Sequence, residues 1–159
     1  MNLVGNLKQG NAETINLIFP NYKFDLIYSF GVLHHTPNIM AALKSIRSLC
    51  NTSTIFKFMV YAKNSYKNAL IKSGLEQPEV QSGCPIANTY TNEEINNLLK
   101  KSGFKLINIE QTHIFPFKVE KYVNYEYELE EWFACMPKEI FNALERNFGW
   151  HLLCTAKLA

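Results

Sequence analysis

The sequence is poor in three features on which several classes of protein depend. Asp25 is the only aspartate among fourteen acidic residues, which excludes mechanisms that need two aspartates, such as the dyad of aspartic proteases. Arginine occurs only at Arg47 and Arg146, so the many lysines indicate AT-rich codon usage rather than a basic function. No apolar run approaches the roughly 20 residues needed to cross a bilayer, and we expect no membrane partner.

Charge and cysteine usage narrow the choice further. The formal net charge of +2 is too small to neutralise a phosphate backbone, so nucleic acid is not expected as a partner. Cys50, Cys84, Cys135 and Cys154 form no CxxC pair and no zinc-type spacing, which predicts reduced thiols and no metal. The N-terminus shows no basic region followed by a long apolar stretch, which favours a cytoplasmic location. With 159 residues, 47% of them apolar, we expect one domain over residues 1–159.

Short apolar runs alternate with segments of helical periodicity. Phe24–Phe30 and Thr54–Tyr61 are aromatic and β-branched runs typical of strands buried on both faces, and the first is expected to lie centrally. Between them, Thr36 as N-cap and Pro37 in the first turn predict a helix whose apolar residues recur as far as Leu49. Strand, helix and strand in this order form a parallel crossover, which indicates an α/β fold.

The second half repeats this alternation. Ser65 predicts the cap of a short helix that closes at Gly74. Thr91 and Glu94 form a capping box for a helix that ends at Gly103. A strand, a helix with proline in its first turn and glycine at C′, and a final strand are expected at Phe104–Glu110, Met136–Phe148 and Trp150–Ala156. Residues 112–135 are an aromatic insertion whose glutamates predict a solvated face.

Three segments carry a family resemblance. GNAETINLIFPNYKFDLIYSFGVLHHTPNIMAALKSI resembles the middle of class I S-adenosylmethionine-dependent methyltransferases (type 11-like), where a GDAE-like turn precedes a strand of FDLVYS type and then GVLHHTPD. YTNEEINNLLKKSGF and GWHLLCTAKL resemble the helix before that family's sixth strand and its closing strand. The resemblance implies a partial Rossmann-like, mostly parallel sheet. Its strands would begin near Phe24, Thr54, Trp150 and Phe104 in that order, with the Trp150 strand in the penultimate position and antiparallel to its neighbours.

The family's first two strands and its GxGxG cofactor loop have no counterpart, because Gly5 and Gly10 are isolated. The resemblance therefore implies the C-terminal part of an N-terminally truncated domain, in which the Phe24 strand becomes an edge. A truncated gene, a split enzyme and a degenerate paralogue all remain open. The expected partner at that edge is a missing N-terminal half or, through self-association, a second copy of the chain.

The resemblance also implies cofactor-binding residues. Asn11 stands where the family's aspartate accepts a hydrogen bond from the adenine amino group, and the Ala12 N–H would meet a ring nitrogen; the alternative is an ordinary Gly-Asn turn. Phe30 and Gly31 follow the carboxyl end of a strand, where open α/β sheets bind ligands. Glycine there would let the cofactor approach the backbone, and His34 completes this set.

His34 and His35 are the candidate catalytic residues. Because they are adjacent, we expect them to point in different directions and not to form a helical zinc pair. One would face the acceptor as a base or orienting group, and the alternative for each is a structural role. Cys84 is weighed as a thiolate against a small loop residue, and Tyr90 with the aromatic insertion as an acceptor pocket against core.

The resemblance implies methyl transfer from S-adenosylmethionine, the expected cofactor, to an unidentified small or medium acceptor, and hence a small-molecule substrate. The missing glycine loop predicts that the chain alone binds this cofactor weakly or not at all. One alternative is a non-catalytic methyltransferase-like interaction module that binds a partner through its strand edge. A second, an unrelated nucleotide-binding domain, is disfavoured because no glycine-rich phosphate loop exists in the sequence.

Overall fold

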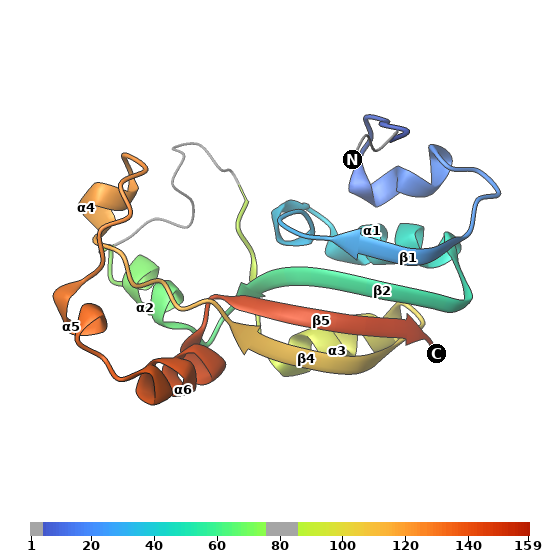
Figure 1. The fold of residues 1–159 in the computed structure, drawn as a ribbon. Coiled ribbons are helices and arrows are strands. Elements are labelled where there is room, and N and C mark those ends of the chain that lie inside the picture. The colour runs from blue at the N-terminus through green and yellow to red at the C-terminus, as the bar shows by residue number, and fades with distance from the viewer. Residues whose placement is uncertain (1–4, 76–85) are drawn as a thin grey trace.

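Five strands form one mixed sheet (Figure 1). The computed structural model describes residues 5–75 and 86–159. The strands are β1 Phe24–Ser29, β2 Cys50–Ala62, β3 Thr89–Tyr90, β4 Phe104–Thr112 and β5 His151–Leu158. β1 is parallel to β2, whereas β5 lies between β2 and β4 and is antiparallel to both. The order β1-β2-β5-β4 and the direction of β5 confirm the predicted topology and the α/β class.

Two helices, α1 Ile39–Ser48 and α3 Asn92–Lys101, pack on one face of the sheet and bury its centre. Side chains alternate along β2, so every second residue points to this face. Their burial removes a continuous apolar surface from water, which is the main stabilising contribution of the fold. The core includes Leu43 and Ile46 from α1, Phe56, Phe58 and Val60 from β2, Ile95 and Leu99 from α3, and Leu152 and Cys154 from β5.

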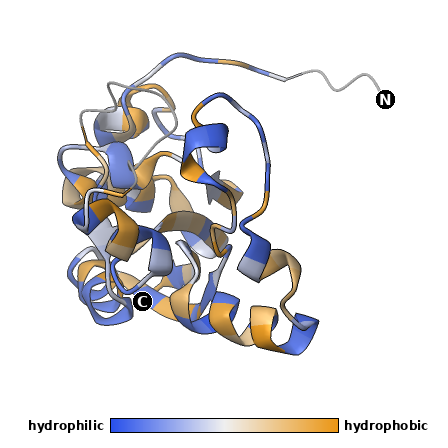
Figure 2. Ribbon diagram, turned by 90° about the vertical axis from the view of Figure 1, so that its left-hand side faces the viewer, coloured by the Kyte–Doolittle hydropathy of each residue, from blue (hydrophilic) through white to orange (hydrophobic). Residues whose placement is uncertain are grey.

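η1 Ala12–Leu17 precedes β1 and packs against α1. The remaining helices lie toward the end at which β1 and β2 finish, and they are η2 Leu33–His35, α2 Tyr66–Lys72, α4 Val119–Tyr122, α5 Glu131–Ala134 and α6 Lys138–Phe148. Figure 2 views the molecule from this end, where hydrophobic and hydrophilic segments alternate along the helices. In the part of the chain that the structure describes, no helix combines the length and apolar character needed to cross a bilayer.

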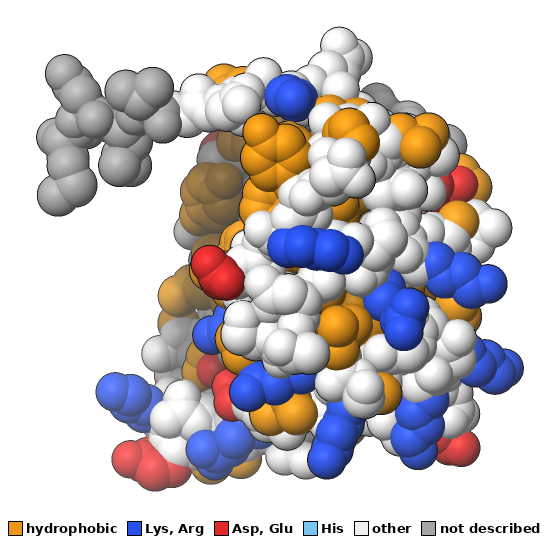
Figure 3. Space-filling view, turned by 90° about the vertical axis from the view of Figure 1, so that its right-hand side faces the viewer, with side chains coloured by type: hydrophobic (Ala, Val, Ile, Leu, Met, Phe, Trp, Pro, Cys, Tyr) orange, Lys and Arg blue, Asp and Glu red, His pale blue; other side chains and the backbone are white. Residues whose placement is uncertain are grey.

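The opposite end of the sheet is rich in basic side chains (Figure 3). By the topology, this end carries the last turn of α1, with Arg47, and the last turn of α3, with Lys100 and Lys101. Cations near helix C-termini offset the negative end of the helix dipole. The basic face therefore has a structural explanation in the fold.

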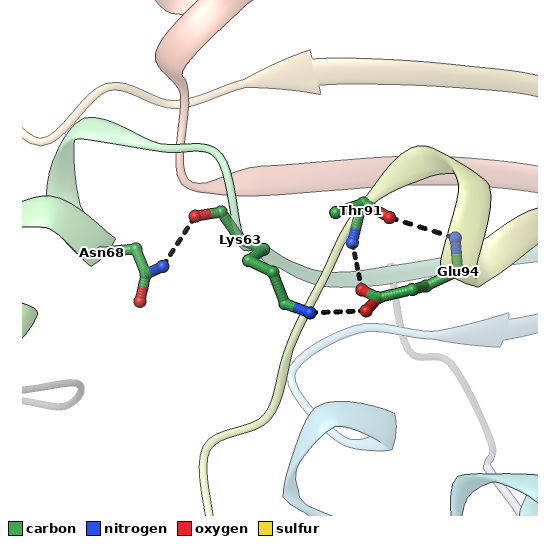
Figure 4. A network of polar contacts seen from close by, with 4 residues as sticks. All are labelled: Lys63, Asn68, Thr91 and Glu94. Carbon is green, nitrogen blue, oxygen red and sulfur yellow. Dashed lines mark hydrogen bonds and ion pairs between the residues drawn. The ribbon is translucent and has the colours of Figure 1, made fainter.

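The predicted capping box of α3 is present (Figure 4). The Glu94 backbone N–H donates to Thr91 Oγ1 at 3.1 Å, and the Thr91 backbone N–H donates to Glu94 Oε2 at 2.7 Å. Lys63 Nζ donates to the other oxygen of Glu94 at 2.5 Å, and thereby ties the end of β2 to the start of α3. Ser65 caps α2 by accepting from the Asn68 N–H at 3.1 Å, as predicted.

Three predicted helix ends differ from the structure. The N-cap of α1 is Asn38, whose Oδ1 accepts from the Ala41 N–H at 3.0 Å, and not Thr36, whose hydroxyl donates to the Leu33 carbonyl at 2.8 Å. Pro137 is the N-cap of α6 and lies before its first turn. Gly149 ends α6 with φ −61° and ψ 155°, so it is not a left-handed C′ residue; glycine is needed because a Cβ would collide with the Thr112 carbonyl.

The expectation that β1 is central and buried on both faces is wrong, whereas its expected position at an edge is confirmed. Leu26 is 57% exposed and Tyr28 62% exposed. An apolar run predicts a buried strand only if neighbours cover it, and among the described residues β1 pairs with β2 alone. The short β3 was not predicted, because two residues are too few to show a periodicity.

Candidate functional site

An apolar hollow of about 410 Å³ lies between η1, β1 and the start of η2, and we call it the β1 hollow. Ala12 and Ile15 line it from η1, and Val32 and Leu33 from the segment after β1. Its volume lies within the usual range of ligand pockets. Apolar side chains also gather near the N-terminal segment in Figure 3. This hollow is the candidate cofactor site.

The turn before η1 is well defined. Asn11 Oδ1 accepts from the Glu13 N–H at 2.9 Å and so caps η1. Glu13 Oε1 in turn accepts from the Asn38 N–H at 2.8 Å, which joins this turn to the start of α1. The Asn11 side chain is exposed, and its carboxamide already acts in a structural cap. Of the two predicted adenine contacts, Ala12 lines the hollow, whereas Asn11 lies between the lining residues Gly10 and Ala12 and is not itself part of the lining.

The segment after β1 is open to solvent. Gly31 has a φ of 70°, and no atom of its surroundings lies within 4 Å of the place where a Cβ would stand. The Phe30 ring is 41% exposed and stacks on Tyr28 with centroids 4.6 Å apart. A backbone position with left-handed φ favours glycine. The open space beside Gly31 leaves room for a ligand to approach the backbone.

His34 is fully buried, with 0% exposure. Neither ring nitrogen has a hydrogen-bond partner within the described ranges. Burial, followed by the charge of His35, lowers the pKa of His34 from 6.5 to about 3; the Met59 backbone opposes this shift only in part. The imidazole is therefore neutral near pH 7. The structure places it inside the protein and not on the wall of the β1 hollow.

His35 is held by a hydrogen bond. Its Nδ1 lies 2.6 Å from the Ile86 carbonyl oxygen. Because a carbonyl only accepts, Nδ1 carries the proton, and the neutral ring then has its lone pair on Nε2. The Asn88 N–H donates to the His34 carbonyl at 2.9 Å, so both histidines connect the turn after β1 to the segment before β3.

The expectation that the two histidines point apart is wrong. Their ring centroids are 4.1 Å apart, and both rings contact Tyr61, at 3.8 Å for His34 and 5.7 Å for His35. Both side chains turn toward Tyr61 because that ring projects from the end of β2 beside η2. Tyr61 was not predicted as part of this site.

All four histidines of the protein lie around Tyr61 at the same end of the sheet. The Tyr61 ring stacks on Trp150 at 4.2 Å and lies 6.0 Å from His151, which stacks on His113 at 4.4 Å. Burial, then the charges of His113 and Lys67, lowers the pKa of His151 from 6.5 to about 4. Trp150 is 3% exposed, in line with its expected structural role. No sequence spacing revealed this cluster, because its members come from β2, from η2, from the residue after β4 and from the start of β5.

The remaining candidates have different outcomes. Cys84 lies outside the described residues. Tyr122 of the insertion packs edge-on against Phe115, with centroids 4.4 Å apart, whereas Trp132 is 46% exposed. Part of the insertion thus belongs to the core, and part of it is exposed, where it can line a pocket. Among residues 5–75 and 86–159, no three His, Cys, Asp or Glu side chains are placed to hold a metal ion.

Comparison with known proteins gives a family and a set of similar folds. A family model described as methyltransferase domain matches residues 4–109. No curated protein matches the chain. A solved S-adenosylmethionine-dependent methyltransferase from Clostridium acetobutylicum superposes with a TM-score of 0.60 at 12% identity, over 99% of this chain and 66% of that one.

Two further structures have the same fold. An S-adenosylmethionine-dependent methyltransferase from Thermotoga maritima gives a TM-score of 0.57 at 16% identity, over 93% of this chain and 62% of that one. The magnesium protoporphyrin IX methyltransferase of Synechocystis, solved with bound SAH, gives 0.51 at 13% identity, over 94% of this chain and 49% of that one. The chain thus spans less than two thirds of the Thermotoga protein.

Proposed function

The chain belongs to the methyltransferase domain family, and from this membership we propose that it takes part in methyl transfer from S-adenosylmethionine to a small or medium acceptor molecule. The observation that carries the proposal is that the matched residues 4–109 include an open apolar hollow, which runs along β1 and reaches Val32 and Leu33 beyond its carboxyl end. Ligands of open α/β sheets bind beyond the carboxyl ends of the strands. In Figure 1 the segment after β1 lies at this end of the strand, and η1 lies alongside β1.

The residues at β1 fit the adenosyl part of the cofactor. The β1 hollow offers an apolar wall for a flat base, and Gly31 offers backbone without a side chain in the way. We assign cofactor contacts to Asn11, Ala12, Phe30 and Gly31. His34 would support the site indirectly, because its buried ring packs on Tyr61 and so holds the turn after β1 in place.

The chemistry asks the protein mainly for orientation. The bound sulfonium supplies an activated methyl group; the chain's residues align the acceptor, exclude water and remove a proton where the acceptor carries one. His35 is the candidate base. The Ile86 carbonyl fixes its Nδ1–H tautomer, so the acceptor's proton would pass to Nε2. His34 is a weaker candidate, because its ring is fully buried and its pKa of about 3 makes it a poor base.

The test is cofactor binding measured by titration calorimetry. We expect the 159-residue chain to bind S-adenosylmethionine more weakly than about 10 μM, and a fusion that supplies a GxGxG-containing N-terminal half to bind more tightly. In that fusion, Gly31→Val should abolish binding. Gly74→Val is the matched control, since Gly74 has the same kind of backbone, with φ 73° and no atom within 4 Å, but lies at the end of α2. Equal affinity in the two variants would remove the assignment of the site.

The exposed β1 edge favours a second function, a non-catalytic interaction module. A strand with unpaired backbone groups and exposed apolar side chains is suited to pairing with another chain. This reading predicts a protein that binds a partner strand at β1 and shows no cofactor binding even in the fusion. The same calorimetric titration therefore separates the two functions.

A further inference from the structure

A second hollow, of about 600 Å³, lies between α2, the segment after β4, α5 and α6, and we call it the α2 hollow. Its apolar wall is formed by Ile114, Trp132, Leu144 and Phe148. This volume is typical of pockets for small molecules. None of the residues assigned to the β1 hollow lines it, so it is a separate site.

The aromatic wall is preformed. Trp132 stacks on Phe133 with ring centroids 3.8 Å apart and meets Tyr66 edge-on at 5.7 Å. Phe133 is 5% exposed and anchors the tryptophan, whose own side chain stays 46% exposed. An indole ring that is fixed on one side and open on the other offers a flat surface at a small entropic cost.

The polar part of the α2 hollow is basic. Lys63 and Lys72 line it together with Asn64 and Asn68, and no Asp or Glu is among the described residues that line it. Lys63 already binds Glu94 at 2.5 Å, which largely neutralises its charge. Lys72, in the last turn of α2, is exposed and supplies the positive charge of this wall.

Along the sheet, the α2 hollow follows the β1 hollow, which is the candidate site of the methyl donor. β1 ends opposite Phe58 of β2, η2 follows and packs its two histidines on Tyr61, and the lining of the hollow begins at Lys63. Figure 1 shows the same order, from β1 through the turn that follows it to α2. His35 belongs to η2 on this path and is among the lining residues of neither hollow.

We propose that the α2 hollow binds the methyl acceptor, and that this acceptor has a flat aromatic body and an anionic group such as a carboxylate. The identification of the ligand as a methyl acceptor rests on the proposed methyl transfer. The ligand class rests on the hollow alone: the Trp132 wall selects the aromatic body and the Lys72 ammonium selects the negative charge.

The experiment titrates the 159-residue chain with three probes of one shape, namely naphthoate, naphthylmethanol and naphthylmethylammonium, by calorimetry. We expect naphthoate to bind most tightly. Trp132→Ala should weaken its binding about tenfold, since the exposed ring is a central contact. Ile140→Ala, at a 52% exposed position of α6 outside the lining, is the matched control and should change nothing.

Lys72→Met tests the charge. It should reduce the preference for naphthoate over naphthylmethanol by about threefold to tenfold, whereas Lys44→Met, at an exposed position of α1, should leave it intact. Equal affinity for all three probes, naphthoate binding weaker than about 1 mM, or insensitivity to Trp132→Ala would overturn the inference.

The outcome is independent of the cofactor titration. Cofactor binding by the fusion without naphthoate binding would overturn this inference and leave the proposed function standing. Naphthoate binding that responds to Trp132 and Lys72, without cofactor binding, would support the ligand class and count against methyl transfer.

Discussion

The two edge strands of the sheet, β1 and β4, differ in the side chains that they expose. β4 exposes polar side chains, Lys105, Asn108 and Glu110, beside one large apolar side chain, Ile107, which is 51% exposed. Charged side chains protect an edge strand from pairing with another chain, whereas an irregular register occurs in both edge strands and does not distinguish them. β1 instead exposes Leu26 and Tyr28. β4 thus carries more charge along its exposed side than β1, and we expect β1 to be the edge that pairs with another chain.

The largest expected effect separates the centre of the sheet from the β1 edge. Leu152 of β5 is 1% exposed and Leu26 of β1 is 57% exposed. We expect Leu152→Ala to lower the free energy of unfolding by about 3 kcal/mol, since it leaves a cavity, and Leu26→Ala by less than about 1 kcal/mol. Urea denaturation of both variants measures the difference. A similar loss in both would show that β1 is covered in solution, for example by a second copy of the chain.

The fold could largely be predicted from sequence, because its signals are local. The capping box at Thr91 and Glu94 lies within one helical turn, and the strand runs of β2 and β5 are long and apolar. Thr36 and Asn38 show where local signals end: both are cap-forming residues, and packing of the turn after β1 decides between them. The exposure of β1 was not readable from its composition, because a covered and an uncovered edge have the same apolar pattern.

The candidate site could be predicted only in part. The position of Gly31 after a strand was readable, since ligands of such sheets bind there. The histidine cluster was not, because His113 and His151 meet His34 only through the antiparallel insertion of β5 next to β2. The α2 hollow was equally hidden, because its wall combines α2 with residues from Ile114 to Phe148, far later in the chain.

The second prediction concerns the pH dependence of the unfolding free energy, which we expect from histidines in the covered part of the sheet. The pKa values of His34 and His151 are lowered from 6.5 to about 3 and about 4. In the unfolded chain these histidines take up protons near pH 6.5, whereas in the folded chain they stay neutral. The unfolding free energy should therefore be constant above about pH 6.5 and fall as the pH drops toward 4, by about 1–3 kcal/mol.

Urea midpoints at neutral and acidic pH measure this loss. The variant His151→Phe keeps an aromatic ring beside Tyr61 and removes one titrating group, so its stability should depend less on pH. An unchanged dependence would mean that other groups cause the acid sensitivity. Leu26→Ala serves as the control, because Leu26 is exposed at the β1 edge and its replacement should leave the pH dependence of the unfolding free energy unchanged.

A third prediction tests the β1 edge directly. We expect the purified chain to self-associate, and Tyr28→Lys to weaken the association about tenfold, because a lysine on an edge strand opposes pairing. Ile107→Lys is the matched control on β4, where the replaced side chain is 51% exposed. Sedimentation equilibrium measures both. A chain that stays monomeric at every concentration, or equal effects of the two lysines, would contradict the expected difference between the two edges.

The smallest expected effect lies where the end of β2 is tied to α3. Glu94 accepts from Lys63 and from the Thr91 N–H, and these two contacts, in that order, lower the pKa of its carboxyl group. Lys63 and Glu94 are 39% and 44% exposed, so water screens the ion pair and Lys63→Met should cost only a few tenths of a kcal/mol. Thr91→Ala removes a cap and should cost about 1 kcal/mol, whereas Glu94→Gln keeps an acceptor for the Thr91 N–H and should resemble Lys63→Met. Thermal unfolding of the three variants gives the ranking. If Lys63→Met cost more than Thr91→Ala, the ion pair and not the capping box would fasten α3 to the covered side of the sheet.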